Sequence, residues 1–147
     1  MGAREEIEAL IFAYAERLDA GDLAGVGALF AEGGYGAEAG PLAHGAAAVE
    51  ALLRDFVVLH EDGTPRTKHV TTNLAIELDE DAGEARVRSY FTVIQGMPGE
   101  EPRPIVLGRY RDRFARGPGG WRFAERRASI DLVGDTSRHL RRAVSGS

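Results

Sequence analysis

The hydrophobic periodicity of the chain changes in residues 67–95, TKHVTTNLAIELDEDAGEARVRSYFTVIQ. Before this stretch, apolar residues recur at the spacing of one helix face, whereas within it they alternate with polar residues, as in half-buried strands. Asp81, Ala82 and Gly83 are typical of a short hairpin turn. The stretch therefore predicts strands at 67–79 and 84–95, which pair as an antiparallel hairpin.

The sequence after this hairpin predicts two more strands, at 104–116 and 120–133, joined by a glycine-rich turn. The connection 96–104 contains several prolines, so we expect a loop that forms the rim of a pocket. Strict alternation in the last strand puts Trp121, Phe123 and Arg127 on one face. Ile130 and Leu132 belong to the other face, and this conflict predicts a bulge or a strong bend.

The first part of the chain predicts three helices. Residues 4–19 carry the apolar stripe of an amphipathic helix at Ile7, Leu10, Ile11, Tyr14 and Leu18. A short second helix begins after Asp22, a third begins after Gly45, and residues 33–45 are expected to form a loop. Helices followed by strands indicate an α+β domain in which three N-terminal helices pack on a strongly bent antiparallel sheet. Such a sheet leaves a cone-shaped cavity open at one end.

Length and composition limit the class of protein. The 147 residues suit a single domain, expected at 1–135 with a C-terminal tail at 136–147. Acidic residues outnumber Lys and Arg by 23 to 18, so the chain has no overall positive field for nucleic acid. Cysteine is absent, which excludes thiolate nucleophiles and thiolate metal sites. No apolar run has membrane-spanning length and the N-terminus is charged, so we expect a cytoplasmic protein without membrane contact.

Three segments together resemble one known family. They are IEALIFAYAERLDAGDLAGVGALFAE (7–32), KHVTTNLAIELDEDAGEARVRSYF (68–91) and GRYRDRFARGPGGWRFAERRASIDLVGD (108–135). Their sequence and order resemble the SnoaL-like branch of the nuclear-transport-factor-2-like superfamily, which implies a cone-shaped α+β barrel. The resemblance also implies a homodimer that pairs through the outer sheet face. The superfamily contains dehydratases, ketosteroid isomerases, polyketide cyclases, epoxide hydrolases and non-catalytic subunits, so the fold alone does not select a function.

Within that superfamily, the chain is most similar to the scytalone and bile-acid dehydratase group. The pocket of that group contains a first-helix tyrosine and aspartate, a strand histidine and a last-strand arginine. The residues in matching segments here are Tyr14, Asp19, His69 and Arg127. The bile-acid dehydratase pattern also separates its tyrosine and aspartate by five residues. Scytalone dehydratase differs, because it has a second histidine where this chain has Ser89 and Tyr90.

These residues suggest cofactor-free acid/base chemistry next to a carbonyl group. His69, oriented by Asp19, would take a proton from carbon and return it to a departing hydroxyl. Tyr14, helped by Arg127, would hydrogen-bond the carbonyl oxygen as it becomes negative. The predicted function is therefore a lyase or isomerase that dehydrates a small hydrophobic substrate or shifts its double bond.

Each of these residues also has a structural alternative. Residues five apart on a straight helix differ by about 140° in direction, so Tyr14 and Asp19 share a face only if the last turn unwinds near Gly21. Asp19 could instead solvate the turn, and Tyr14 could be a core aromatic. His69 could be a surface or strand-end histidine, and Arg127 could form an ion pair with Asp112 or Asp131.

We predict additional substrate-binding residues on the same pocket wall: Tyr35, Phe56, Asn73, Tyr90, Phe91 and Trp121. No two histidines have the spacing of metal ligands and no phosphate-binding loop is present, so we predict neither a metal nor a cofactor. His44, His60 and His139 receive no role.

Two alternatives to this function remain open at the level of sequence. The first is a polyketide cyclase or a ketosteroid-isomerase-like enzyme in which Asp19 or Asp112 is the base and His69 only a hydrogen-bond donor. The second is a non-catalytic protein, either a ligand-binding protein or a subunit like the small subunits of ring-hydroxylating dioxygenases.

Overall fold

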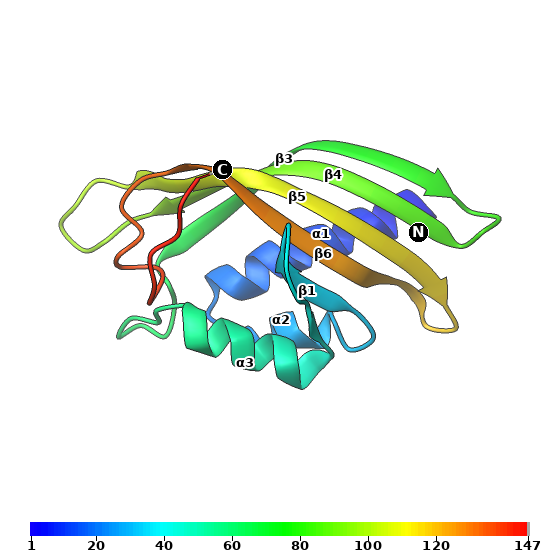
Figure 1. Ribbon diagram of the computed structural model, residues 1–147, viewed down its shortest axis with the longest axis horizontal. Helices are drawn as coiled ribbons and strands as arrows, with labels where there is room; N and C mark the ends of the chain where they lie inside the picture. Colours follow the sequence, from blue (N-terminus) through cyan, green and yellow to red (C-terminus); the bar gives the residue numbers. More distant parts are fainter. Residues whose placement is uncertain (147) are drawn as a thin grey trace.

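The computed structural model describes residues 1–146 as a curved sheet with helices on its concave side (Figure 1). The helices are α1 (Ala3–Asp19), α2 (Leu23–Ala28) and α3 (Ala46–Phe56). The strands are β1 (Gly34–Ala37), β2 (Ala43–His44), β3 (Thr67–Asp79), β4 (Glu84–Gln95), β5 (Arg103–Gly117) and β6 (Gly120–Val133). The predicted α+β class is confirmed, and the four long strands follow the three helices, but the short strands β1 and β2 precede α3.

The six strands lie in the order β2-β1-β6-β5-β4-β3. The four long strands are antiparallel to one another, whereas β1 pairs with β6 in parallel. Strands β2 and β3 are the two edges of the sheet and do not pair with each other. The predicted cone-shaped barrel is therefore a strongly curved sheet that wraps around the helices without closing.

The prediction of a loop at 33–45 is wrong, because this segment contributes β1 and β2. Glycine and alanine provide no alternating apolar pattern, so the sequence has no strand signal there. A Cβ on Gly36 would lie 3.0 Å from the carbonyl oxygen of Pro41, so the close approach of the chain favours glycine. The main-chain pairing of β1 with β6, rather than side-chain patterning, makes this segment a strand.

A β-bulge in β6 reverses the direction of its later side chains. Phe123 pairs with Phe114, but the next pair is Glu125 with Arg113, which leaves Ala124 as the extra residue. A bulge or a strong bend was predicted between Arg127 and Ile130, but this bulge precedes Arg127, so the strict alternation from Trp121 to Arg127 is wrong. Consequently Arg126 points into the protein and is fully buried.

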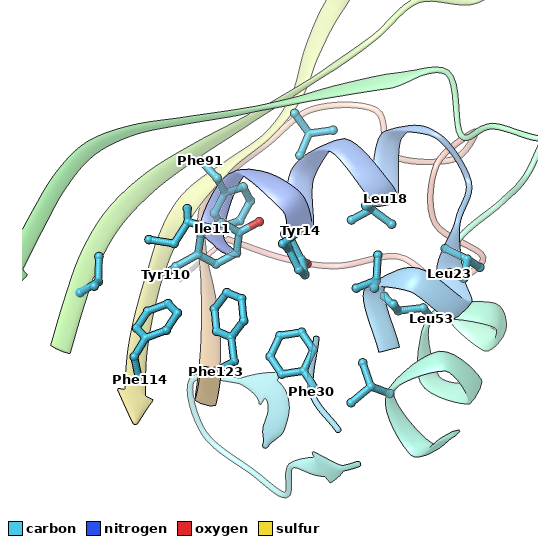
Figure 2. Close-up of a cluster of buried hydrophobic side chains, with 14 of the residues drawn as sticks. Ile11, Tyr14, Leu18, Leu23, Phe30, Leu53, Phe91, Tyr110, Phe114 and Phe123 are labelled. Carbon is cyan, nitrogen blue, oxygen red and sulfur yellow. The ribbon is translucent and has the colours of Figure 1, made fainter. Parts of the chain in front are cut away.

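Aromatic side chains cluster in the core where α1 and the turn after α2 meet the sheet (Figure 2). Phe30 stacks on Phe123 at 4.8 Å between ring centroids, and Phe114 lies 4.5 Å from Phe123. Burying each ring fully stabilises the fold by roughly 1.5–3 kcal/mol. Tyr14 of α1 joins these rings, with its centroid 6.3 Å from that of Phe30 and 5.8 Å from that of Tyr110, so the packing holds α1 against the sheet.

The segment after β6 folds back beside the end of the sheet toward α3 (Figure 1). The amide of Val58 donates to the carbonyl oxygen of His139 at 2.8 Å, and the amide of Arg141 donates to that of Phe56 at 2.9 Å. The segment predicted as a tail thus packs against the residues that follow α3. In the part of the chain that the structure describes, no helix has both the length and the apolar character needed to span a lipid bilayer.

Candidate functional site

A largely apolar cavity of about 390 Å³ lies between α1, α3, the sheet and the C-terminal segment. Its polar side chains are few: Tyr14, Tyr35, His69, Tyr110 and His139. Among the described residues, no Asp, Glu, Lys or Arg lines this cavity. Its chemistry is therefore set by three hydroxyl groups and two imidazoles in an apolar wall.

Asp19 and His69 form the closest polar pair at this cavity. Carboxylate oxygen Oδ1 of Asp19 lies 2.6 Å from Nδ1 of His69, and Oδ2 accepts the main-chain N–H of His69 at 2.8 Å. The hydroxyl of Thr67 donates to Oδ1 at 2.8 Å. Both side chains are nearly enclosed, with 11% of Asp19 and 7% of His69 exposed. The predicted proximity of these two residues is present in the structure.

The environment of Asp19 favours its ionised form. Desolvation by burial raises the pKa of Asp19, but the hydrogen bonds and charge interaction with His69, together with the bond from Thr67, outweigh it. The pKa of Asp19 therefore lies below its ordinary value. An ionised carboxylate can only accept, so Nδ1 of His69 carries the proton and Nε2 is the nitrogen left for chemistry.

Helix α1 presents Asp19 to β3 without the expected unwinding. The amide of Ala20 still donates to Glu16 at 3.0 Å, so the helix is regular through Asp19. Gly21 then turns the chain at φ 77°, where a Cβ would lie 1.9 Å from the carbonyl oxygen of Gly63. Tyr14 and Asp19 do not need a shared helix face, because Asp19 meets the start of β3 while Tyr14 points toward β1.

The hydroxyl of Tyr14 lies 2.7 Å from the hydroxyl of Tyr35, and both rings line the cavity. Burial raises the pKa of Tyr14 and of Tyr35 well above the ordinary value, so both hydroxyls remain protonated. One of the two protons forms the bond between the hydroxyls. The hydroxyl of Tyr14 also hydrogen-bonds that of Tyr110, so the three hydroxyls share two hydrogen bonds and one of their three protons is left for a ligand oxygen.

Arg127 does not reach the cavity, contrary to the prediction. Its guanidinium lies beside β1, where Nη1 donates to the carbonyl oxygen of Ala37 at 3.2 Å and Nε donates to Glu125 at 3.3 Å. The bulge at Ala124 turns Arg127 away from the concave side of the sheet. The sequence contained no signal for the exact position of this bulge.

The buried arginine is the preceding residue, Arg126. It donates to both carboxylate oxygens of Asp112, at 2.8 and 2.9 Å, and neither side chain is exposed. Its guanidinium carbon lies 3.7 Å from the ring centroid of Tyr110 and 4.4 Å from that of Tyr14. Desolvation lowers the pKa of Arg126, but the charge of Asp112 outweighs it and the net pKa is raised, which keeps the guanidinium positive behind these tyrosines.

The predicted wall residues divide into two groups. Tyr35, Phe56 and Phe91 line the cavity. Asn73, Tyr90 and Trp121 do not line it, contrary to the prediction. Asn73 lies in the irregular stretch between Thr72 and Ala75, which breaks the alternation that would have aligned it with His69.

Tyr90 and Trp121 miss the cavity for different reasons. Tyr90 is 53% exposed on the outer face of β4, because its neighbour Phe91 takes the inward position. Trp121 is buried near the end of β6, where Arg116 lies 5.6 Å from its ring centroid. Period-two alternation assigned Trp121 correctly to the inner face, but it did not indicate how far along the strand the cavity extends.

His139 was given no role from the sequence, yet it lines the cavity and is only 4% exposed. Its ring centroid lies 5.8 Å from that of His69. Burial, followed by the charge of His69, lowers the pKa of His139 to about 4, so its ring is neutral at neutral pH. A lone histidine after the last strand carries no local pattern that could have identified it.

Among the described residues, no three His, Cys, Asp or Glu side chains lie close enough together to hold a metal ion. The candidate site is thus defined by the Asp19–His69 pair, the Tyr14–Tyr35 pair and the neutral ring of His139.

Comparison with known proteins agrees with this architecture. The chain is 34% identical over 93 residues to the anthranilate 1,2-dioxygenase small subunit of Burkholderia cepacia. These aligned residues are 59% of this chain and 53% of that protein. The chain therefore spans about half the length of this curated relative.

Two solved structures illustrate the shared fold. One is a nuclear-transport-factor-2-like protein with a cystatin-like fold from Novosphingobium aromaticivorans, 24% identical, with a TM-score of 0.73 over 92% of this chain and 86% of that one. The other is ActVI-ORFA from Streptomyces coelicolor, 25% identical, with a TM-score of 0.73 over 89% of this chain and 98% of that one.

The family model that describes the SnoaL-like domain matches residues 1–127. This family includes polyketide cyclases, dehydratases and dioxygenase small subunits. The match covers most of the chain, so the protein belongs to the SnoaL-like family of the nuclear-transport-factor-2-like superfamily.

Proposed function

We propose that the protein is a cofactor-free lyase or isomerase that acts next to the carbonyl group of a small, hydrophobic substrate. The observation that carries this proposal is the 2.6 Å contact between Asp19 and His69 at the wall of an apolar cavity. A histidine whose tautomer is held by a carboxylate is the arrangement expected of a general base.

In the proposed dehydration, Nε2 of His69 removes the proton on the carbon between the carbonyl and the hydroxyl-bearing carbon. The electron pair of that bond moves toward the carbonyl oxygen and forms an enolate. The hydroxyl that keeps a free proton among the hydrogen-bonded Tyr14, Tyr35 and Tyr110 donates to the enolate oxygen, where a preorganised donor contributes a few kcal/mol of barrier lowering. The guanidinium of Arg126 behind Tyr14 adds favourable positive charge.

The second step returns the proton. The enolate electrons form a carbon–carbon double bond and the β-hydroxyl leaves with the proton carried by His69, so the products are a conjugated carbonyl compound and water. In the proposed isomerisation, His69 returns the proton to a different carbon and no water is released.

The test uses the β-hydroxy derivative of benzylacetone, whose dehydration produces benzalacetone and is followed by near-ultraviolet absorbance. We expect turnover by the wild type and a loss of about 10²–10⁴-fold in kcat/KM for His69→Ala. The matched control is His44→Ala, because His44 is exposed and does not line the cavity. An equal rate for His69→Ala and wild type on any substrate that the protein turns over would exclude His69 as the base.

A second candidate function is that of a non-catalytic subunit, which the likeness to the anthranilate 1,2-dioxygenase small subunit favours. In that case the Asp19–His69 pair would only join α1 to β3. Purification of the untagged protein at its natural expression level separates the two candidates. A stoichiometric large subunit that remains bound through gel filtration supports the subunit, whereas an isolated protein that turns over a hydroxylated ketone supports the enzyme.

A further inference from the structure

The imidazole of His139 is a buried polar group that the proposed proton transfer does not use. Its Nδ1 atom is enclosed and has no hydrogen-bond partner among residues 1–146. The ring lines the cavity and lies against that of His69, with 5.8 Å between centroids and 64° between planes. The titratable groups around it are His69 on β3, Asp19 at the end of α1, and His60 after α3.

The main chain holds this ring in place. The carbonyl oxygen of His139 accepts the amide of Val58 at 2.8 Å, and its own amide donates to the carbonyl oxygen of Thr136 at 3.0 Å. The preceding carbonyl, that of Arg138, accepts from Gln95 at 2.9 Å and contacts the His60 ring at 2.8 Å. Since bonds on both sides of the residue fix the backbone, the ring remains at the cavity wall.

No described protein atom bonds Nδ1 of this imidazole, so its partner has to come from a molecule in the cavity, either water or a ligand that displaces it. Leaving a buried donor or acceptor without a partner costs about 1–3 kcal/mol, and buried polar atoms in proteins are rarely left so. Phenylalanine or leucine would fill the same wall without that cost. Because no carboxylate or cationic side chain of the described chain lines the cavity, a complementary ligand is uncharged.

We propose that His139 is a specificity-determining residue that hydrogen-bonds the hydroxyl group of an uncharged hydroxy-carbonyl substrate beside His69. This inference rests on the proposed function for its choice of substrate class. The carbonyl oxygen of the substrate lies at the Tyr14–Tyr35 pair and its hydroxyl lies between the two imidazoles. A neutral ring both donates and accepts, so it holds a hydroxyl without attracting a carboxylate.

The test measures binding alone, so its outcome is independent of turnover. Two probes are used: benzylacetone with two methyl groups on the carbon between its carbonyl and benzyl groups, and the β-hydroxy derivative of the same compound. Neither can be dehydrated, because that carbon has no proton. Isothermal titration calorimetry yields the ratio of their Kd values for each variant, and circular dichroism verifies the fold.

We expect wild type to bind the hydroxylated probe about 10-fold more tightly than the other, the effect of one neutral hydrogen bond in a buried site. His139→Phe should reduce the ratio to about 1, His139→Gln should retain part of it, and the matched control His44→Phe should keep all of it. The proposal is overturned if His139→Phe keeps the wild-type ratio, if wild type shows no preference, or if neither probe binds. An unchanged turnover of His69→Ala would contradict the proposed base and leave this ratio unaffected.

Discussion

Asp19, the last residue of α1, binds His69 at both its main-chain amide and its ring Nδ1, at 2.8 and 2.6 Å. The same carboxylate therefore places the strand and orients the imidazole. A helix C-terminus is an unfavourable location for a negative charge, so the three hydrogen bonds from β3 are what keep Asp19 ionised there.

Asp19→Asn should lower kcat by about 10²–10⁴-fold with little change in KM, because an amide no longer selects the tautomer with a free Nε2. Steady-state kinetics on the hydroxylated ketone measures this. Asp22→Asn is the matched control, since the exposed Asp22 only caps α2 and asparagine caps equally well. A kcat of Asp19→Asn close to that of wild type would show that the carboxylate has only a structural role.

Tyr14→Phe and Tyr35→Phe should each lower kcat by about 10²-fold, because each removes one hydroxyl of the hydrogen-bonded set, which includes Tyr110, that donates to the enolate. The double variant should lose little more than either single one, since the two hydroxyls act as a unit. Tyr90→Phe on the outer face is the control and should match wild type. Additive losses in the double variant would show that the two hydroxyls act separately.

Arg126→Met should lower the free energy of unfolding by about 3–5 kcal/mol, because it leaves the buried carboxylate of Asp112 without a partner. Arg127→Met, one residue later, should change it by less than about 1 kcal/mol, since this guanidinium is partly exposed. Urea denaturation of both variants makes the comparison. Equal losses would contradict the inward direction of Arg126. The combined change Arg126→Met, Asp112→Leu should recover much of the stability.

The free energy of unfolding should fall as the pH decreases from about 6.5 to about 4. Burial lowers the pKa of His139 from 6.5 to about 4, with His69 as the next contribution, so the unfolded chain binds this proton more readily. Stability from this group is fully present above the unfolded pKa and is lost toward the folded one, by up to about 3 kcal/mol. Chemical denaturation across this window measures the loss.

His139→Phe should remove most of this pH dependence, whereas His44→Phe should preserve it. Asp19 contributes at lower pH, because the pKa of its carboxylate is below the ordinary value and its stabilisation disappears as that group is protonated. An unchanged slope between pH 6.5 and 4 in His139→Phe would contradict a neutral, buried His139.

The outer face of the sheet should form a homodimer interface. Tyr90 on β4 is 53% exposed there, among arginines such as Arg109, which pairs with Asp131 at 2.9 Å. Sedimentation equilibrium should yield twice the mass of one chain, and Tyr90→Glu should shift the equilibrium toward monomer. Phe12→Glu, a comparable change at a partly exposed residue of α1, should not. A monomeric wild type at micromolar concentration would exclude this interface.

The periodicity of the sequence was sufficient to predict the long elements. The strands at 67–79, 84–95 and 120–133 have the predicted bounds, because side chains alternating across a half-buried sheet leave a period of two in the sequence. The proximity of Asp19 and His69 was likewise predicted, through a resemblance in which the tyrosine-to-aspartate spacing within one helix was the specific feature. These features are local, so they are visible in a short window of residues.

Tertiary structure alone decided the remaining parts of the site. Because Ala124 is an extra residue in β6, Arg126 rather than Arg127 points into the interior. The neighbouring sequence does not specify where in a strand such a bulge forms. β1 exists because its main chain pairs with β6, and His139 reaches the cavity because the C-terminal segment bonds to residues after α3. Both depend on contacts between residues far apart in the chain. A period in the sequence records which face of an element is buried, but not which distant segment covers it.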